Sequence, residues 1–383
     1  MRTFLEAVQG VAEIVDILFY VPEGTDISQD SVTKIQENLG KSWSINANVT
    51  FSSMLCNLKP SRMEYYLLPV TSFFNHLGYR DVSGIEQVAA FEKCLERNPD
   101  AIFIHRLSSV CPALLTRKKL PPVFFDLDDI EHVTFFRSNR QPPFWFGKLF
   151  YYLQMPSLML GERRAIHLAK KTFVCSDLDC VYLSRLYKNS HVVTIPNSVD
   201  IPEIEPGYGH TKKMLFIGTY TYGPNIAAAE FLIDIIWPIV KRSVPDARLL
   251  IVGKKPENIS SFKARPEGVE FSGFLTTLGE AYKNTQVVCC PVLTGGGTRL
   301  KIIEAASYGK TIVSTRLGAE GLDFKDGYEI ILRDGEIDFA NACIEFLRNP
   351  SKCREIGKRA REKTIAAYDR GQIIHAISRQ LTG

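Results

Sequence analysis

Residues 287–309 join three local signals that together allow very few folds. The segment opens with VVCC, an apolar, β-branched run that is typical of a buried parallel strand. Gly295, Gly296 and Gly297 follow, where the backbone can take positive φ or come close to a ligand. A helical apolar pattern then starts at Thr298, whose hydroxyl is suited to cap a helix. This order predicts an anion site, because unpaired N–H groups point outward at a helix N-terminus.

Charged side chains beside this turn indicate what the anion site would bind. Arg299 and Lys301 place two cations near the helix N-terminus, and Glu304 lies about one turn further along. Two cations suit a diphosphate, and a carboxylate accepts two hydroxyls such as those of a ribose. The spacings of a P-loop and of a dinucleotide-binding loop are both absent from this turn. The alternatives are a tight turn without a ligand, an exposed basic helix face, and an ion pair of Glu304 with Lys301 or Lys310.

The rest of the chain alternates strand-like and helix-like segments in two series. Strand-like runs lie at 14–21, 48–53, 101–105, 121–129, 171–176 and 191–197, and then at 214–218, 248–253, 269–273, 287–290 and 311–315. Such alternation predicts parallel sheets covered by helices. We therefore expect an α/β protein with two Rossmann-like, doubly wound parallel-sheet domains that face a cleft, at 1–197 and 214–383. Residues 198–213 are polar and aperiodic, which predicts a linker.

Composition excludes several classes of protein. The 383 residues, 45% hydrophobic and 23% charged, are typical of a soluble globular protein with room for two cores. A formal net charge of +4 over this length does not indicate nucleic-acid binding. The 9 cysteines are scattered without a C-x-x-C pair, which favours a reduced cytoplasmic interior. We expect neither a signal peptide nor a membrane-spanning helix. The chain starts with a helical pattern, so the first strand of the N-terminal domain is expected to be missing.

Ligands of open parallel sheets bind beyond the carboxyl ends of the strands. Residues at these ends are His105-Arg106, Asp126 to His132, Gly218-Thr219, Gly253-Lys254, Gly273-Phe274 and the loop 294–301. In the first series, Asp126, Asp128 and Asp129 share one turn with His132. The alternatives here are a capped helix, a structural histidine and, on weak support, a metal site.

The run PPFWFGKLFYYLQMPSLML at 142–160 is the most apolar and aromatic part of the chain. It lies in a helical region at 144–170, and its pattern favours a buried helix. The alternative is an acceptor channel or a membrane-facing patch, with Lys148, Arg163 and Arg164 beside it.

Most of the chain, and residues 214–322 most specifically, resembles the GT-B glycosyltransferases of the large retaining family 4. The matching segments are FIGTYTYGPN (216–225), LLIVGKKP (249–256), VEFSGFL (269–275), GGGTRLKIIEAASYGKTIVSTRLGAEGL (295–322) and, less specifically, FFDLDDIEH (124–132) and TIPNSVD (194–200). The resemblance implies a hexosyltransferase that moves a glucose-type sugar from a UDP-sugar, with retention, to a growing glycan or lipid-linked saccharide in polysaccharide biosynthesis. It also implies no cofactor and no metal, a last helix that returns to the N-terminal domain, and a cytoplasmic protein with peripheral membrane contact.

The resemblance assigns roles to individual residues. The nucleotide-binding set carried over by position is Gly218, Thr219, Gly253, Gly273, Phe274, Gly295, Gly296, Gly297, Thr298, Arg299, Lys301 and Glu304. Gly273 and Phe274 would hold the base, and Glu304 the ribose hydroxyls. Arg299 and Lys301 would neutralise the diphosphate leaving group, which makes a metal ion unnecessary.

On the acceptor side, Asp128 falls where many family members have a histidine or aspartate that touches the reacting sugar. His105 ends the neighbouring strand. In a retaining mechanism the leaving phosphate itself can take the acceptor's proton, so Asp128 would stabilise oxocarbenium-like charge.

The chain departs from the family pattern at two points. Family members usually carry two glutamates eight positions apart, and Gly296 stands where the first would be. Backbone N–H groups of 295–297 would then meet the donor sugar. The usual Arg and Lys after the first strand of the second domain are absent from GTYTYGPN, which leaves more of the diphosphate charge to Arg299 and Lys301.

Two other functions fit the same residues. Nucleotide-sugar 2-epimerases share the two-domain shape and bind UDP-sugars, but they need an acid–base cluster that only residues 126–132 offer here. A binding module without catalysis is favoured by the missing first strand. Product analysis without an acceptor separates an epimerase from a transferase, and measurable turnover excludes a mere binder.

Overall fold

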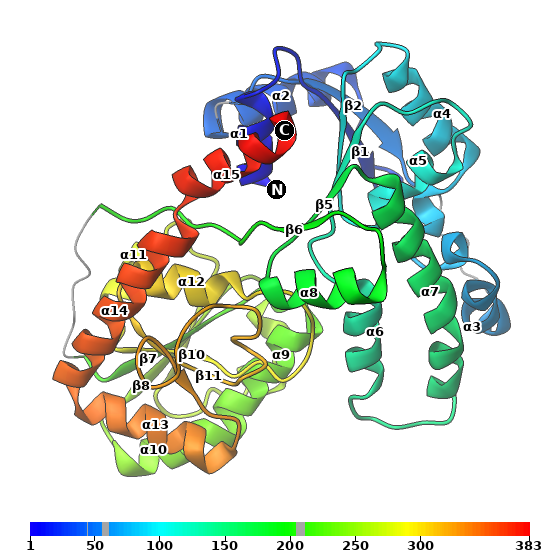
Figure 1. Ribbon diagram of the computed structural model, residues 1–383. Coiled ribbons are helices and arrows are strands. Elements are labelled where there is room, and N and C mark those ends of the chain that lie inside the picture. The colour runs from blue at the N-terminus through cyan, green and yellow to red at the C-terminus, as the bar shows by residue number, and fades with distance from the viewer. Residues whose placement is uncertain (44, 56–60, 204–210) are drawn as a thin grey trace. The chain divides into compact units, whose positions relative to one another are not determined.

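The computed structural model describes residues 1–43, 45–55, 61–203 and 211–383. Within these ranges the chain forms two compact units: unit 1 comprises Met1–Ile195 and Ile373–Gly383, and unit 2 comprises Pro196–Gln372. Both are built on parallel strands with helices between them (Figure 1), which confirms the predicted α/β class. Of the expected linker, residues 204–210 lie outside the described residues, and the remainder belongs to unit 2.

Unit 2 is built around a six-stranded parallel sheet with the order β12-β11-β10-β7-β8-β9. Its strands are β7 (Lys213–Ile217), β8 (Arg248–Val252), β9 (Val269–Gly273), β10 (Val287–Cys290), β11 (Thr311–Ser314) and β12 (Ile331–Leu332). Every residue of β10 and β11 is buried, as expected for a parallel strand with helices on both faces. The first strand of the unit, β7, lies between β8 and β10, so the strand order reverses there.

The helices of unit 2 include one long apolar span, although the sequence predicted no helix of membrane-spanning length. They are α9 (Gly223–Glu230), α10 (Trp237–Ser243), α11 (Gly279–Lys283), α12 (Leu300–Ser307), α13 (Glu336–Arg348), α14 (Pro350–Tyr368) and the start of α15 (Arg370–Thr382). A π-helical segment joins α9 to α10, and among the described residues this Gly223–Ser243 helix is long and apolar enough to cross a membrane. Its Leu232, Ile236 and Val240 pack in the core of unit 2, as the residues of a core helix do.

Unit 1 holds its parallel strands in two sheets. β1 (Asp16–Val21) pairs with β2 (Asn48–Ser53), and β3 (Ile102–His105), β4 (Val123–Asp126), β5 (Lys171–Val174) and β6 (Val192–Thr194) form a four-stranded sheet in that order. The first helix, α1 (Arg2–Gln9), contacts both groups of strands. Its Phe4 ring lies 5.0 Å from Phe103 in β3, and its Leu5 packs with the apolar side chains of β1 and β2.

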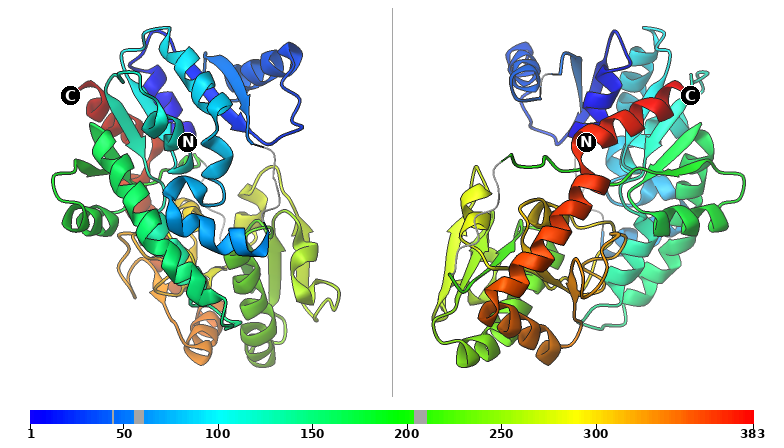
Figure 2. Two further views of the ribbon diagram at one scale, coloured as in Figure 1. Left: turned by 90° about the vertical axis from the view of Figure 1, so that its right-hand side faces the viewer. Right: turned by 60° about the vertical axis from the view of Figure 1, so that its left-hand side comes forward.

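Helices of unit 1 flank these strands. They are α2 (Gln29–Trp43), α3 (Arg62–Thr71), α4 (Ile85–Leu95), α5 (Cys111–Leu115), α6 (Glu131–Asn139), α7 (Lys148–Leu168) and α8 (Asp177–Leu186). The C-terminal part of α15 belongs to the same unit, because Ile373 and Ile377 pack with Phe124 and Phe173. α6 and α7 form an antiparallel hairpin (Figure 1, Figure 2).

The aromatic run is not a buried helix throughout, so the expectation from its composition is wrong for the first half. α7 begins at Lys148, and the residues before it lie in the connection between α6 and α7. Phe144 and Phe146 in this connection are 75% and 79% exposed. Buried positions such as Gln154 and Leu158 occur only further along α7. Composition could not show this, because apolar content does not reveal which neighbours cover a side chain.

Candidate functional site

Glycines bring the loops after three neighbouring strands of unit 2 together. Gly253, after β8, has a φ of 144°, and a Cβ there would lie 1.6 Å from the carbonyl oxygen of Gly218, after β7. Only glycine allows this approach. The Gly253 N–H donates to the carbonyl oxygen of Gly273, at the end of β9, over 2.7 Å. The predicted residues Gly218, Thr219, Gly253 and Gly273 therefore lie at one edge of the sheet.

The glycine-rich loop after β10 is held in a tight curve by its own arginine. Gly295 and Gly297 have φ values of 100° and 66°, in the left-handed region that favours glycine. The guanidinium of Arg299 donates to the Gly297 carbonyl oxygen over 2.6 Å and also to that of Gly296. It reaches the Thr294 carbonyl oxygen at 3.3 Å. The diphosphate role of Arg299 stays a prediction; the structure shows its guanidinium bonded to carbonyl oxygens of the loop.

The start of α12 differs from the sequence prediction. Arg299 is the N-cap, and α12 has no side-chain cap among the described residues. The prediction that Thr298 caps this helix is therefore wrong. The Thr298 hydroxyl instead accepts a hydrogen bond from Asn197 Nδ2 over 2.7 Å. A helix start without a capping side chain keeps its first N–H groups available to an anion.

Lys301 lies beyond the neighbouring strands β7 and β10, where the strand order reverses. Its ammonium donates to Asn225 Oδ1 over 2.8 Å and lies 4.5 Å from the centroid of the Phe216 ring. Asn225, in α9, also donates to the Thr219 carbonyl oxygen over 3.1 Å. Burial and the nearby Arg299 cation lower the pKa of Lys301. An anion bound beside Lys301 would stabilise the charged ammonium and so oppose both of these effects on its pKa.

Glu304 contacts a tyrosine. From the sequence, the alternative to ligand binding was an ion pair of Glu304 with a lysine. The Tyr282 hydroxyl donates to Glu304 Oε2 over 3.2 Å, and the Tyr282 ring stacks on Tyr308 at 4.5 Å. Burial raises the pKa of Glu304, although the bond from Tyr282 lowers it. The carboxylate thus already accepts a hydroxyl, which is the kind of contact that a ribose would make.

An exposed aromatic ring lies at the same edge of the sheet. Phe274 directly follows β9 and is 61% exposed. The ammonium of Lys254, which follows β8, lies 4.6 Å from its ring centroid. Gly273, with a φ of 68°, turns the chain just before this ring. Such a ring offers a flat apolar face on which a nucleotide base can stack.

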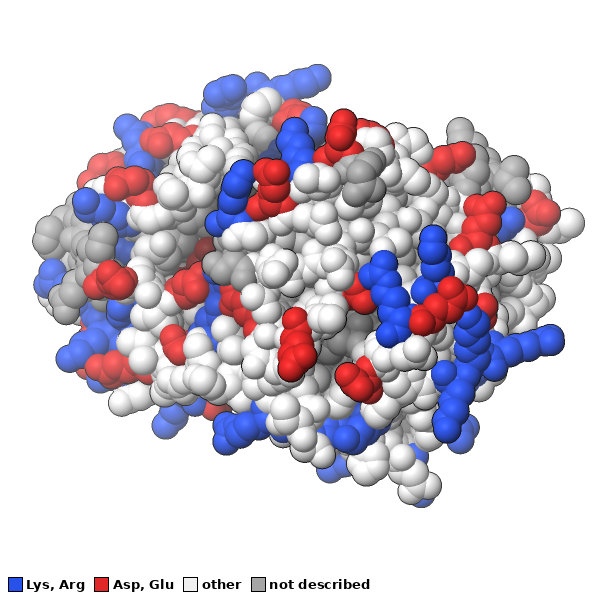
Figure 3. All heavy atoms as spheres, turned by 90° about the horizontal axis from the view of Figure 1, so that it is seen from above, with Lys and Arg blue, Asp and Glu red and all other residues white. Residues whose placement is uncertain are grey.

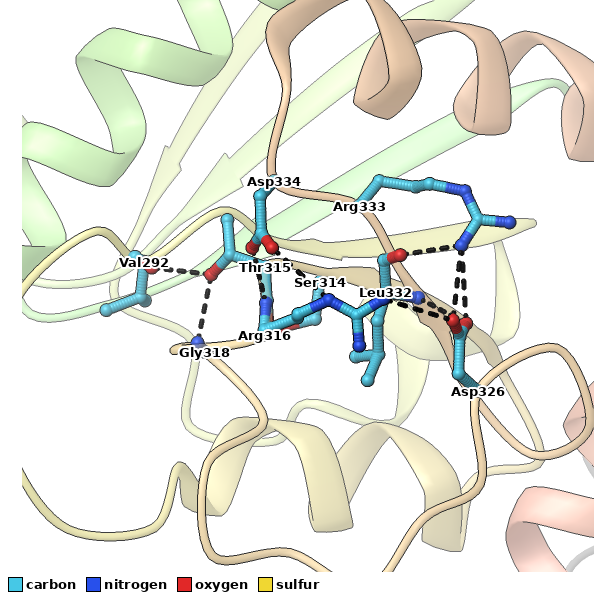
Figure 4. A network of polar contacts seen from close by, with 9 residues as sticks. All are labelled: Val292, Ser314, Thr315, Arg316, Gly318, Asp326, Leu332, Arg333 and Asp334. Carbon is cyan, nitrogen blue, oxygen red and sulfur yellow. Dashed lines mark hydrogen bonds and ion pairs between the residues drawn. The ribbon is translucent and has the colours of Figure 1, made fainter.

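The loop after β11 braces the glycine-rich loop (Figure 4). Thr315 Oγ1 donates to the Val292 carbonyl oxygen over 2.5 Å and accepts from the Gly318 N–H over 2.9 Å. The backbone N–H of Arg316 donates to Asp334 Oδ1 over 2.8 Å, and its guanidinium pairs with the same carboxylate. Segments distant in sequence therefore hold the stretch that leads from β10 into the glycines.

In unit 1 the predicted acceptor-side residues lie at the ends of β3 and β4. His105 is the register partner of Asp126, and its Nδ1 lies 2.7 Å from Asp126 Oδ2. Arg106 Nε lies 3.2 Å from Asp128 Oδ2. Arg106 and Asp128 have φ values of 70° and 63°, which are strained for residues with a side chain. Such strain is concentrated at functional sites, which favours this edge as one.

His132 does not lie with these residues, although the sequence placed it in the same turn. It is buried in α6, with Nδ1 2.5 Å from Glu162 Oε2 and Nε2 2.7 Å from the Tyr182 hydroxyl. The Tyr187 hydroxyl also donates to Glu162, over 3.2 Å. This buried network fastens α6 to α7 and α8. α6 has Ile130 as N-cap and no side-chain capping bond, so the aspartates before it do not cap it.

Several contacts at these sites had no local signal in the sequence. Tyr282 and Glu162 lie 22 and 30 residues from their partners, and only the folded chain brings each pair together. Glu131 is half-buried, and the desolvation of its carboxyl, followed by the like charges of Asp129 and Glu162, raises its pKa to about 7. Among the described residues, no group of three or more His, Cys, Asp or Glu is arranged to hold a metal ion.

Comparison with known families agrees with this architecture. Residues 211–349 match the family model of the glycosyl transferases group 1. This part of unit 2 is similar to the glycosyl transferases group 1. An uncharacterized 44.6 kDa protein in the cps region of Klebsiella pneumoniae is 22% identical to it over 245 residues, 61% of this chain and 62% of that protein. A phosphatidyl-myo-inositol mannosyltransferase of Mycobacterium leprae is 27% identical over 210 residues, 50% and 53% of the two chains. The chain thus matches less than two thirds of the length of either relative.

Two solved structures resemble the chain over its whole length. Sucrose-phosphate synthase from Thermosynechococcus elongatus has a TM-score of 0.70 at 16% identity and covers 100% of this chain and 91% of its own. Anabaena HepE in complex with UDP and glucose has a TM-score of 0.67 at 13% identity, with 100% and 95% covered. At such identities the likeness concerns the fold, and it confirms the predicted GT-B architecture of two Rossmann-like units.

Proposed function

We propose that this protein transfers a hexose from a UDP-sugar, with retention of configuration, to a growing glycan or lipid-linked saccharide. The observation that carries the proposal is the meeting of Lys301, Asn225 and the glycine-rich loop beyond β7 and β10. There the strand order reverses, and an open parallel sheet binds its ligand at that point. The UDP in the HepE complex supports a uridine nucleotide. Retention is proposed on the resemblance to family 4.

The donor nucleotide would use groups along one edge of unit 2. Its base stacks on the exposed Phe274, beside the cation of Lys254. Its ribose hydroxyls replace the Tyr282 hydroxyl on Glu304 or join it there. The diphosphate meets the uncapped start of α12 and the ammonium of Lys301. Burial leaves the ammonium of Lys301 poorly solvated, so a bound anion would stabilise its charge.

The reaction breaks the bond between the sugar's anomeric carbon and the diphosphate oxygen. Negative charge grows on that oxygen as the bond breaks, and the cation and helix N-terminus stabilise it. The acceptor oxygen attacks the same face of the sugar, and its proton passes to the leaving phosphate. The Asp128 carboxylate stabilises the positive charge on the sugar ring. Because fixed groups carry the leaving-group charge, we propose that no metal ion is required.

A cytoplasmic location is part of the proposal. The described cysteines form no disulfide, which agrees with a reducing compartment. The saccharide acceptor, alone or linked to a lipid, is proposed to bind unit 1, at the His105, Asp126 and Asp128 edge.

Nucleotide binding tests the donor site directly. Titration calorimetry with UDP, GDP and ADP should give the tightest binding for UDP. Phe274→Ala removes an exposed ring and should weaken UDP binding by about 1–3 kcal/mol, the usual worth of one base stacked on an aromatic ring. Ile337→Ala, at an exposed position of α13, is the matched control and should leave the affinity unchanged. Equal UDP affinities in the two variants would show that the base does not stack on Phe274.

Product analysis tests the reaction itself. UDP-sugars are incubated with a panel of saccharide and lipid-linked acceptors, and products are identified by mass spectrometry and their anomeric configuration by NMR. We expect a lengthened acceptor with the donor's configuration. A new UDP-sugar formed without any acceptor would show an epimerase, and an inverted product would contradict retention.

A further inference from the structure

Two tyrosines in the loop after β7 have opposite surroundings. Tyr220 is fully buried, and its hydroxyl donates to the Val252 carbonyl oxygen over 3.1 Å. Tyr222, two residues further on, is 47% exposed. It is the N-cap residue of α9, which has no side-chain cap among the residues that the structure describes. Core packing therefore explains Tyr220, whereas neither core packing nor helix capping explains Tyr222.

The Tyr222 hydroxyl lies against the glycine-rich loop. A Cβ placed on Gly295 would lie 3.1 Å from this hydroxyl, 3.2 Å from Arg299 Nη2 and 3.6 Å from Pro224 Cγ. Because Gly295 has no Cβ, the hydroxyl and the guanidinium can both approach the same side of its Cα. The hydroxyl comes from the loop after β7 and the guanidinium from the loop after β10. Tyr222 therefore connects the two strand ends at which the strand order reverses.

Backbone bonds hold Tyr222 in this place. Its N–H donates to the Thr219 carbonyl oxygen over 3.2 Å, and its carbonyl oxygen accepts from the Asn225 N–H over 3.0 Å. Asn225 is also the residue whose side chain accepts a bond from the Lys301 ammonium. One short turn therefore positions both the Tyr222 hydroxyl and the partner of that ammonium.

The cations beside this turn have no carboxylate partners. On the face of the molecule drawn in Figure 3, Lys and Arg side chains lie among Asp and Glu. Arg299, in contrast, donates to backbone carbonyl oxygens, and Lys301 donates to a neutral amide. Neither of them forms an ion pair within the described part of the chain. The Tyr222 hydroxyl thus lies beside positive charge that no side chain cancels, which attracts an anion.

We propose that Tyr222 is a further donor-binding residue, whose hydroxyl donates a hydrogen bond to the diphosphate of the UDP-sugar. A phenol has one O–H donor, and a bond to a charged phosphate oxygen is stronger than one between neutral groups. The diphosphate is then held by Tyr222 from α9 and by Lys301 and the start of α12. The inference rests on the proposed function, because it adds a contact to the same donor nucleotide. The nucleotide-binding set expected from the sequence did not include Tyr222.

Titration calorimetry with UDP and with uridine tests this contact, and it needs no acceptor. Tyr222→Phe removes the hydroxyl and keeps the ring, so UDP should bind about tenfold more weakly. Uridine has the same base and ribose but no phosphate, and its affinity, measured by competition with UDP, should not change. Tyr328→Phe is the matched control, because Tyr328 is 46% exposed in the same unit and lies beside Arg359. Its UDP affinity should equal that of the unchanged protein.

The outcomes separate this contact from the proposed function. An unchanged protein that binds no UDP would overturn both. If the unchanged protein binds UDP and Tyr222→Phe binds it equally well, only the Tyr222 contact is overturned. Equal losses of UDP and uridine affinity in Tyr222→Phe would also overturn it, because the hydroxyl would then act on the base, the ribose or the shape of the site. Thermal melts of both variants should match that of the unchanged protein, since each loses one hydroxyl from an exposed side chain.

Phosphorus NMR of bound UDP provides a direct readout of the same contact. The α- and β-phosphorus atoms give separate signals, and a hydrogen bond donated to one phosphate shifts the signal of that phosphorus. At saturating UDP, at least one signal should differ between Tyr222→Phe and the unchanged protein, and the signal that moves identifies the phosphate. Tyr328→Phe should leave both signals in place. Identical signals in all three proteins would overturn the proposal.

Discussion

Lys301 Nζ donates to Asn225 Oδ1 over 2.8 Å, and this bond joins the helices that follow the two central strands of unit 2. Lys301 belongs to α12 after β10, and Asn225 belongs to α9 after β7. Its partner is a neutral amide, so the bond positions the ammonium without cancelling its charge. The charge is therefore free to act on an anion at the point where the strand order reverses.

Removing this cation should weaken nucleotide binding. Lys301→Ala is expected to cost about 1–3 kcal/mol of UDP affinity, the worth of a charge-assisted contact. Arg299→Ala should cost a similar amount, because the glycine-rich loop also loses the bonds from its guanidinium. Asn225→Ala should have a smaller effect, since it only frees the ammonium to move. Calorimetry with UDP measures all three, and Lys358→Ala on α14 is the exposed control. Unchanged UDP affinity in Lys301→Ala would show that the diphosphate does not bind at Lys301.

Asp128 should affect catalysis and not nucleotide binding. Asp128→Asn keeps the size of the side chain but removes the charge that favours a cationic transition state. We expect kcat to fall about a hundredfold, while UDP affinity stays nearly unchanged. Asp126→Asn should be milder, because Asp126 contacts His105 and would act only by orienting its ring. Steady-state UDP release compares the two variants. Full turnover by a folded Asp128→Asn protein would show that the reaction depends on another residue.

Chelation should leave turnover intact. In the proposed reaction, the helix N-terminus and the cations Arg299 and Lys301 carry the leaving-group charge that a metal ion would otherwise carry. UDP release measured with excess EDTA should therefore equal the rate without it. If EDTA abolishes activity and magnesium or manganese restores it, a metal site must exist, with the aspartates after β4 as the first candidates.

Glu131 should make stability depend on pH. Its pKa is raised from 4.5 to about 7 in the folded state, so its contribution is present at low pH and is lost as the pH rises through about 7. Between about pH 5 and pH 8 the unchanged protein should lose about 2–3 kcal/mol of unfolding free energy relative to Glu131→Gln. Urea unfolding at both pH values measures this difference. Parallel stability curves would show that the folded state does not raise the pKa of Glu131.

The Glu162–His132 contact should contribute strongly to the stability of unit 1. Glu162 is fully buried, and Glu162→Ala leaves the ring of His132 and the hydroxyl of Tyr187 without this partner. We expect a loss of about 3–5 kcal/mol, as for other buried pairs broken on one side. Glu96→Ala, which removes an exposed pair with Lys118, should cost less than about 1 kcal/mol. Chemical unfolding compares the two variants, and similar losses would contradict the importance of the buried network.

The sequence determined the features that depend on a few neighbouring residues. Runs such as VVCC before the glycines specify a strand and a turn locally, because β-branched side chains and positive φ act within a few positions. The α/β class followed from their alternation. The positions of β2 and β9 were predicted to the residue. Motif order between 214 and 322 was specific enough to indicate the family.

Tertiary structure alone decided which strand ends meet and which side chains are covered. The order β10-β7-β8 places Lys301 beside Asn225, which lies 76 residues away, and no local pattern encodes that distance. Folding also buried His132 against Glu162, although acidic residues precede it in the sequence, and left Phe144 exposed, although it lies in the most apolar run. The physical reason is that burial and pairing depend on contacts between distant segments, and the chemistry of one residue does not specify its neighbours in space.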